Sequence, residues 1–186
     1  MRKINLRTGL LISMIAGIAI CRLIPHPANF SPVGAMALFG GAYFTKKWQA
    51  YLIPLAALFV SDIFVNYLIL QEWMLFHSVA FWVYGALAVN VLLARKLIKK
   101  IRIIHIAGTG LLGSLLFFAI TNFGVWYTDV YHMYPDTPQG LAMCLTAGIP
   151  YLWRTMAGDL FFITVLFGMF ELLKYKYPVA LSPVKY

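Results

Sequence analysis

The sequence predicts an all-α integral membrane protein, a bundle of six transmembrane helices that forms a single domain over residues 1–186. The first observation is composition, because 62% of the residues are hydrophobic and 11% are charged, whereas a soluble domain carries about 25% charged residues. The second is the apolar stretches, several of which approach the roughly 20 residues that cross a bilayer as a helix. The third is charge, since all Lys and Arg except Arg22 and Arg154 fall in four clusters that flank those stretches.

The four basic clusters set the expected topology. Lys and Arg accumulate on the cytoplasmic side of membrane proteins, and six helices with a cytoplasmic N-terminus put every cluster there. We therefore expect a multi-pass protein of the bacterial cytoplasmic (inner) membrane with both termini in the cytoplasm. The net charge of +9 then follows from membrane insertion and from contact with anionic lipid, so no nucleic-acid partner is expected. The clusters are Arg2/Lys3/Arg7, Lys46/Lys47, 95–102 and Lys174/Lys176/Lys185.

Prolines, basic residues and polar connections delimit the six expected helices. Pro25 and Pro27 end the first, because proline lacks a backbone donor and disfavours helix at the preceding residue. Lys46 and Lys47 end a shorter second helix that is rich in small residues, and Pro150 begins the sixth. The expected spans are 8–24, 31–44, 48–70, 75–97, 103–126 and 150–173.

The N-terminal helix and the connection before the sixth helix need a closer interpretation. The basic residues before the first apolar stretch are typical of a signal peptide, but 21–25 is a poor cleavage site, so we expect an uncleaved first helix. A long polar and aromatic connection is expected over 127–148, with a short helix at 139–146. Connections of that length are often binding loops or lids.

Asp62 and Asp159 lie well inside apolar helices, where a lone charge costs about 2.5–3.5 kcal/mol on insertion scales. Such residues usually face the interior of a bundle, where they either hold helices together or contact a ligand, and the sequence leaves both interpretations open. Asn66 follows Asp62 by four residues and shares its helix face. Arg154, near the outer end of the sixth helix, is placed to reach Asp62.

Amide, aromatic and histidine side chains gather on the expected outer face. Asn29 and Asn122 lie at the outer ends of the second and fifth helices, where an amide either bonds a loop carbonyl or meets a ligand. A membrane-interface belt explains some of the rings, and a planar ligand stacked under the long connection explains them as a group. The aromatic and histidine residues of this face are His26, Phe30, Trp73, His77, Trp126, Tyr127, Tyr131, His132 and Tyr134.

The two cysteines, Cys21 and Cys144, are also expected on the outer side. They form a disulfide if that compartment is oxidising. Alternatively, one of them ligates a metal-containing substrate, with His26 as a further candidate ligand. The third alternative is that both are small buried side chains, the state that free cysteine favours. No resident cofactor or metal is expected. Ser13, Gly17 and Cys21 follow one another at four-residue spacing, which gives a small-residue face for close helix packing, inside the bundle or against a partner subunit.

Enzyme motifs of the common classes do not occur in the sequence, which has no zinc-protease, lipase-type or P-loop pattern. We therefore expect a protein that is not an enzyme. Gly158-Asp159 resembles part of the motif of aspartyl intramembrane proteases, but Ser61 precedes Asp62 where those enzymes have tyrosine.

Three segments carry a resemblance to a known family: 22–44, RLIPHPANFSPVGAMALFGGAYF; 122–126, NFGVW, followed by Met133-Tyr134-Pro135; and 149–168. They resemble a family of uncharacterised bacterial membrane transport proteins, and the resemblance covers most of the chain. That family is similar to the S components, the substrate-binding subunits of energy-coupling factor (ECF) importers. The resemblance implies a six-helix protein that binds a vitamin or metal ion near the outer face and docks on a coupling subunit with two ATPases. S components dock through Ala-xxx-Ala on helix one, and this chain has Ser13-xxx-Gly17 instead, so a solitary carrier stays open.

These observations predict a membrane-embedded binding protein for uptake of a vitamin-like or aromatic small molecule, with a corrinoid among the options. The alternatives are a non-transporting membrane scaffold or assembly factor, and an intramembrane aspartyl hydrolase, which requires its two aspartates close enough to share a proton or activate a water. The candidate substrate-binding residues are Asn29, Asp62, Asn66, Asn122, Trp126, Tyr127, His132, Arg154 and Asp159.

Overall fold

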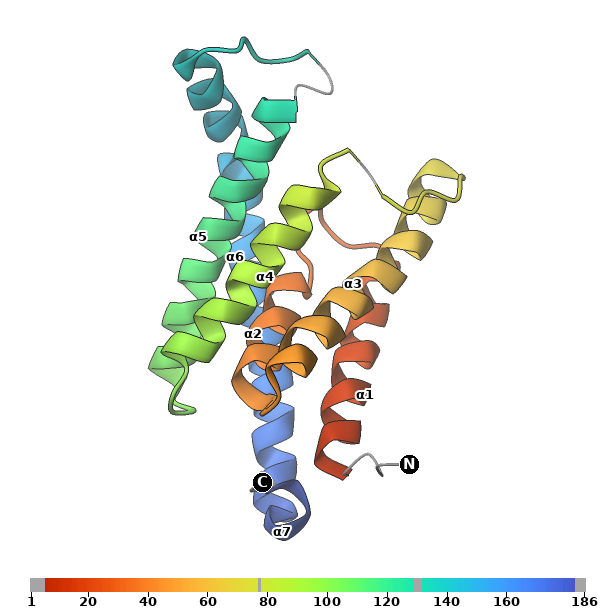
Figure 1. Cartoon of the computed structure of the whole chain (residues 1–186), viewed down its shortest axis with the longest axis vertical. Coiled ribbons are helices and arrows are strands. Elements are labelled where there is room, and N and C mark those ends of the chain that lie inside the picture. The colour runs from red at the N-terminus through yellow and green to blue at the C-terminus, as the bar shows by residue number, and fades with distance from the viewer. Residues whose placement is uncertain (1–5, 77, 129–131, 183–186) are drawn as a thin grey trace.

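A computed structural model describes residues 6–76, 78–128 and 132–182 of the chain. These residues form the all-helical bundle that the sequence predicts (Figure 1). In chain order the elements are α1 (Leu6–Ile20), the 3-10 turn η1 (Cys21–Leu23), α2 (Val33–Tyr43), α3 (Lys47–Leu70), α4 (Ala80–Leu97), α5 (Ile103–Thr128), α6 (Pro138–Lys176) and the four-residue α7 (Pro178–Leu181).

Five of these helices are long and apolar enough to cross a membrane: α1 with η1, α3, α4, α5 and α6. The architecture is that of a multi-pass membrane protein. The sixth main helix, α2, has 11 residues and rises about 16 Å at 1.5 Å per residue, roughly half of the 30 Å hydrocarbon core. The expected helix bundle is therefore confirmed. Of its six main helices, however, α2 is too short to span the membrane by itself.

The short helix α2 lies at the centre of the bundle, where it packs against α1, α3, α4, α5 and α6. Its residues from Ala35 to Phe39 have no exposed surface. Two glycines allow the neighbouring helices to approach its last turn. A Cβ at Gly40 would lie 2.6 Å from Cγ of Pro54 in α3, and one at Gly41 would lie 2.6 Å from the carbonyl oxygen of Val91 in α4.

The C-terminal end of α2 is held by two arginines from other helices. Arg7 of α1 donates to the carbonyl oxygen of Tyr43 at 2.7 Å, and Arg95 of α4 donates to that of Phe44 at 3.1 Å. The last carbonyls of a helix have no partner within the helix and carry the negative end of its dipole. Two cations from the basic clusters therefore satisfy the end of a buried helix that water does not reach.

The connections sort to two ends of the molecule (Figure 1). The start of α1, the α2–α3 and α4–α5 connections and the end of α6 lie at one end, and these are the segments that carry the described basic clusters. Arg2, Lys3 and Lys185 lie outside the described residues. The α3–α4 and α5–α6 connections lie at the opposite end, and the α1–α2 connection lies between the helices on that side. The described basic clusters thus lie together at one end of the bundle.

The expected sixth helix, 150–173, is wrong at its N-terminal end. In the structure α6 has 39 residues and begins at Pro138, with Thr137 as N-cap accepting a hydrogen bond from the backbone N–H of Gly140 at 3.2 Å. Pro150, interpreted as a helix start, lies inside α6, because membrane helices tolerate an interior proline when neighbouring groups satisfy the freed carbonyl. The long connection expected over 127–148 is therefore mostly helix.

The other expected boundaries need smaller corrections. The first helix ends its α-helical part at Ile20 and continues as the 3-10 turn to Leu23. The fourth begins at Ala80 and not at Leu75. Differences of a few residues at helix ends are common where capping, and not hydropathy, sets the boundary.

Candidate functional site

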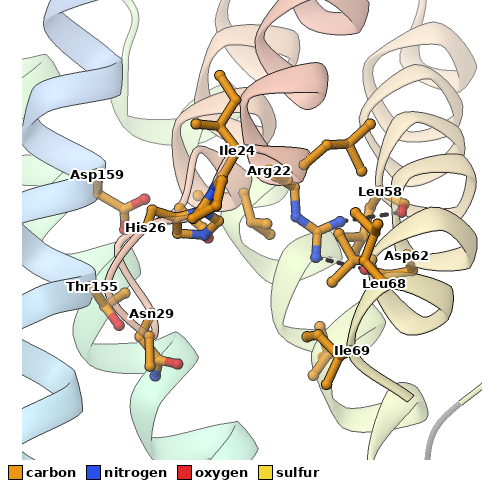
Figure 2. A pocket seen from close by; sticks show the side chains of 18 of the residues that line it. Arg22, Ile24, His26, Asn29, Leu58, Asp62, Leu68, Ile69, Thr155 and Asp159 are labelled. Carbon is orange, nitrogen blue, oxygen red and sulfur yellow. Dashed lines mark hydrogen bonds and ion pairs between the residues drawn. The ribbon is translucent and has the colours of Figure 1, made fainter. Parts of the chain in front are cut away.

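A cavity of about 750 Å³ lies between the α1–α2 connection and the helices α3, α4, α5 and α6. Its walls combine apolar side chains with a few polar ones (Figure 2). The apolar lining comes from two parts of the chain. Residues from η1 to the start of α2 contribute Leu23, Ile24, Pro25, Ala28 and Val33, and the helices α3, α4 and α5 contribute Leu58, Val65, Leu68, Ile69, Val83 and Phe117. The polar and charged lining residues are Arg22, His26, Asn29, Ser31, Asp62, Thr155 and Asp159.

Arg22 and Asp62 form a buried ion pair in one wall of this cavity. Nη2 of Arg22 lies 2.6 Å from Oδ1 of Asp62, and the two side chains are only 13% and 11% exposed. Nη1 of Arg22 donates to Oγ of Ser61 at 2.5 Å. The hydroxyl of Tyr84 on α4 donates to the other carboxylate oxygen of Asp62 at 3.0 Å. The pair thus ties the end of α1 to α3 and, through Tyr84, to α4.

The prediction that Arg154 reaches Asp62 is therefore wrong, because Arg22 forms the ion pair with Asp62. Arg154 is exposed and its guanidinium lies over the ring of Tyr151, 5.8 Å from the centroid. The sequence held a signal for Arg22, which is the basic residue on the side where the charge rule expects few. A buried acid in a neighbouring span explains why a cation is retained there.

Asp159 lies across the cavity from the ion pair and holds the N-terminal end of α2. It accepts hydrogen bonds from the backbone N–H groups of Gly34 and Ala35, and from the hydroxyl of Ser114 at 2.6 Å. Within the described part of the chain, all partners of this 2% exposed residue are neutral donors. The first N–H groups of a helix lack internal partners and carry the positive end of the dipole, so the carboxylate satisfies both.

The α1–α2 connection lines one side of the cavity and carries the exposed residues His26 and Asn29 (Figure 2). Nδ1 of His26 is hydrogen-bonded to the carbonyl oxygen of Ile24 at 2.6 Å. Asn29 has a φ of 66°, a left-handed conformation that asparagine tolerates better than most residues. Gly158 of α6 lets this connection pack closely, because a Cβ there would lie 3.0 Å from the backbone nitrogen of Ser31.

Three of the expected binding residues do not line the cavity, because their side chains bond the protein itself. Asn66 donates to the carbonyl oxygen of Met74 at 3.0 Å, which tethers the α3–α4 connection. Asn122 donates to the carbonyl oxygen of Phe118 at 2.8 Å in the α5–α6 contact. Trp126 donates through Nε1 to the carbonyl oxygen of Pro135 at 3.0 Å.

Tyr127 and His132 also lie away from the cavity lining. Tyr127 is 67% exposed and stacks on Phe123, with ring centroids 5.8 Å apart and planes 15° apart. His132 is exposed and has a φ of 47°. His77 and Tyr131, from the expected aromatic and histidine set, lie outside the described residues. The structure thus brings together Asn29, Asp62 and Asp159 of the expected site.

Both cysteines are free thiols, so the disulfide alternative is not realised in this structure. Cys144 is buried, and its Sγ lies 3.4 Å from the carbonyl oxygen of Asn122. Of the candidate metal ligands Cys21, His26 and Cys144, only His26 lines the cavity. Over the described ranges, no three His, Cys, Asp or Glu side chains are grouped to hold a metal ion. Ser13 and Gly17 lie on an exposed face of α1.

The fold and the cavity together define a class, a multi-pass α-helical membrane protein with a mostly apolar cavity that carries a few polar and charged groups. The chain belongs to the family that is defined as a family of unknown function (DUF6580), which matches residues 2–180. No curated protein is significantly similar to the chain, and no solved structure is either.

Proposed function

We propose that this protein binds a small molecule in the cavity for uptake across the bacterial cytoplasmic membrane, in the manner of an ECF S component. The family match leaves the activity open, so the proposal rests on the cavity itself. The basic end of the bundle would face the cytoplasm and the α1–α2 connection the outside, in accordance with the preference of Lys and Arg for the cytoplasmic side.

The single observation that carries the proposal is the cavity of about 750 Å³. Ligand pockets are commonly 300–1,000 Å³, mostly apolar, with a few placed polar groups. This cavity has an aliphatic and aromatic wall on α3, α4 and α5, and polar groups from the α1–α2 connection and α6. Such a lining suits a vitamin-like or aromatic compound.

The segment that would close over the cavity is the α1–α2 connection. The sequence had predicted that role for 127–148. Seven of the eight residues from Arg22 to Asn29 line the cavity, whereas none of the described residues of 127–148 does. Opening and closing would therefore fall to residues 24–31. The corrinoid option loses the support of the cysteines, because neither lies in the lining.

The arrangement of the two aspartates gives no support to an intramembrane hydrolase. Asp62 is paired with Arg22 and Tyr84, and Asp159 is bonded to Ser114 and the start of α2. Figure 2 shows their carboxyl groups on opposite sides of the cavity, with Arg22 and His26 between them in that view. An aspartyl dyad requires two carboxyls that share one proton.

Energy for uptake would come from an ECF coupling subunit with two ATPases, or the protein would act as a solitary carrier along a gradient. Ser13 and Gly17 suit the first arrangement, because they lie on an exposed face of α1 and a Cβ at Gly17 would have no atom within 4 Å. Small residues on an open helix face permit another helix to approach closely.

The experiment that tests the proposal is native mass spectrometry of the full chain released from detergent or nanodiscs. We expect a mass increment from a co-purified small molecule, together with a rise in unfolding temperature when that compound is added back, since a ligand that binds only the folded state stabilises it. If neither the co-purified fraction nor a panel of vitamins and ring compounds binds, the proposed function is wrong.

A further inference from the structure

We infer that the ligand of this cavity is an uncharged, largely apolar ring compound with a hydrogen-bond donor, such as a carboxamide or ring N–H. This inference rests on the proposed function and deepens it, because it names the chemical class that the site would accept. It follows from the charged side chains of the lining, each of which already has a partner within the protein.

Arg22 is the only Lys or Arg that lines the cavity among the described residues, and its charge is already paired. Its two terminal nitrogens bond Asp62 and Ser61. A carboxylate ligand that took Arg22 would leave Asp62 without its cation. Removing one partner from a buried ion pair leaves an uncompensated buried charge, which is strongly unfavourable. The wall therefore disfavours an anionic ligand.

A cationic ligand is disfavoured for the converse reason. Asp62 already has Arg22 and the hydroxyl of Tyr84 as partners. Asp159 is 2% exposed and faces Ser114 and the first N–H groups of α2, where the helix dipole offsets its charge. Neither acid thus presents an unmatched negative charge to the cavity.

The polar atoms left for a ligand belong to neutral groups. Nδ1 of His26 must donate to the carbonyl oxygen of Ile24, which makes Nε2 an acceptor in the neutral ring. Oγ1 of Thr155 donates to the carbonyl oxygen of Tyr151 at 3.0 Å, so its oxygen is left to accept. The amide of Asn29 and the hydroxyl of Ser31, which also line the cavity, each have both functions. The lining is thus richer in acceptors than in donors, and it suits a ligand that donates.

The test uses sets of compounds that share one ring and differ in one substituent, which is neutral, anionic or cationic. One set is pyridine-3-carboxamide, pyridine-3-carboxylate and 3-(aminomethyl)pyridine, and further sets place the same three groups on benzene and indole. Affinities are measured by calorimetry on the full chain in nanodiscs. We expect the carboxamide to bind at least about tenfold more tightly than either charged member of its set, a conservative value for an unmatched charge in a site of reduced dielectric.

Two variants change the charge balance in a defined direction. Asp62→Asn leaves Arg22 without its anion, so the preference should shift by about tenfold or more toward the carboxylate. Glu171→Gln is the matched control, because Glu171 is on α6 outside the cavity and its removal should leave the preference unchanged. If Asp62→Asn does not fold, the affinities of the three members of each set for the unaltered protein still test whether the cavity prefers an uncharged ligand.

The outcomes separate this inference from the proposed function. Tighter binding of a carboxylate or an amine by the unaltered protein overturns the inference and leaves a binding protein. An unchanged preference in folded Asp62→Asn also overturns it, because charge matching would then not govern selection. If no member of any set binds while the co-purified compound does, the inference is overturned and the proposed function stands. If neither the sets nor the co-purified fraction bind, both fail.

Discussion

The carboxylate of Asp159 occupies the space that a Cβ at position 34 would take. Gly34 is in the first turn of α2, and its missing side chain lets the acid from α6 reach the backbone N–H groups there. With Arg7 and Arg95 at the other end, α2 is held at both ends by charges of the sign that its dipole requires. This explains how an 11-residue helix is stable at the centre of a membrane bundle.

We predict that Gly34→Ala destabilises the protein, because the added methyl group must displace a buried carboxylate. Overpacking of this kind costs about 1–3 kcal/mol. Gly17→Ala is the matched control, since a Cβ there meets nothing within 4 Å and alanine favours helix by about 1 kcal/mol. The free energies of unfolding are measured by denaturant titration in mixed micelles. Equal stability of the two variants would contradict the role assigned to Asp159.

A second prediction concerns the acid itself. Asp159→Ala removes the acceptor for the backbone N–H groups of Gly34 and Ala35, whereas Ser114 keeps the carbonyl oxygen of Gly110 as acceptor. An unsatisfied buried donor costs about 1–3 kcal/mol. We expect the free energy of unfolding to fall by about 2 kcal/mol or more. Asp136→Ala, at an exposed position before α6, should change it by less than about 0.5 kcal/mol. A similar small effect at both positions would show that α2 does not depend on this carboxylate.

The ion pair predicts a strong coupling between Arg22 and Asp62. Arg22→Met or Asp62→Leu should each cost about 3–5 kcal/mol, because each leaves a buried charge unpaired, while the double variant costs much less than the sum. Lys174→Met is the control, since its i,i+3 pair with Glu171 is 39% and 36% exposed and such pairs contribute about 0–1 kcal/mol. Additive effects in the double-mutant cycle would argue that the pair is not formed.

The topology predicts which positions a membrane-impermeant thiol reagent reaches in intact bacterial cells. In a cysteine-free background, Asp136→Cys between α5 and α6 should react with an impermeant maleimide from outside. Lys99→Cys between α4 and α5 should react only after the membrane is permeabilised, because the proposed topology puts the basic end in the cytoplasm. Both positions are exposed in the structure, so the contrast reports the side of the membrane. The reversed pattern would invert the orientation.

The helical bundle and the distribution of charge were predictable because hydropathy and Lys/Arg placement act locally along the chain. The burial of α2 was not, because no local pattern distinguishes a short central helix from a short lipid-exposed one. Pro150 misled the prediction for the same reason: its effect on a helix depends on the neighbours that satisfy the freed carbonyl. A contact between α5 and α6 is not visible in a single sequence.

The candidate site was predictable in part. Asp62 and Asp159 stood out because a charged residue inside an apolar span is costly, and both line the cavity. Asn66, Asn122 and Trp126 fell on the same expected face, but their side chains bond loop or helix carbonyls. The partner of Asp62 was not predicted, because in the sequence Arg22 is only an exception to the charge pattern. The direction of the Arg22 side chain depends on the 3-10 turn η1 that follows α1.

The most direct test of the central claim, that the cavity binds the ligand, compares one substitution at two positions of α3. Val65 lines the cavity, whereas Val60 lies outside the lining and is 53% exposed. Native mass spectrometry of Val65→Trp should show loss of the co-purified compound, because the indole takes up part of the cavity and clashes with a ligand bound against α3, while Val60→Trp retains it. Retention of the compound by folded Val65→Trp would contradict the account.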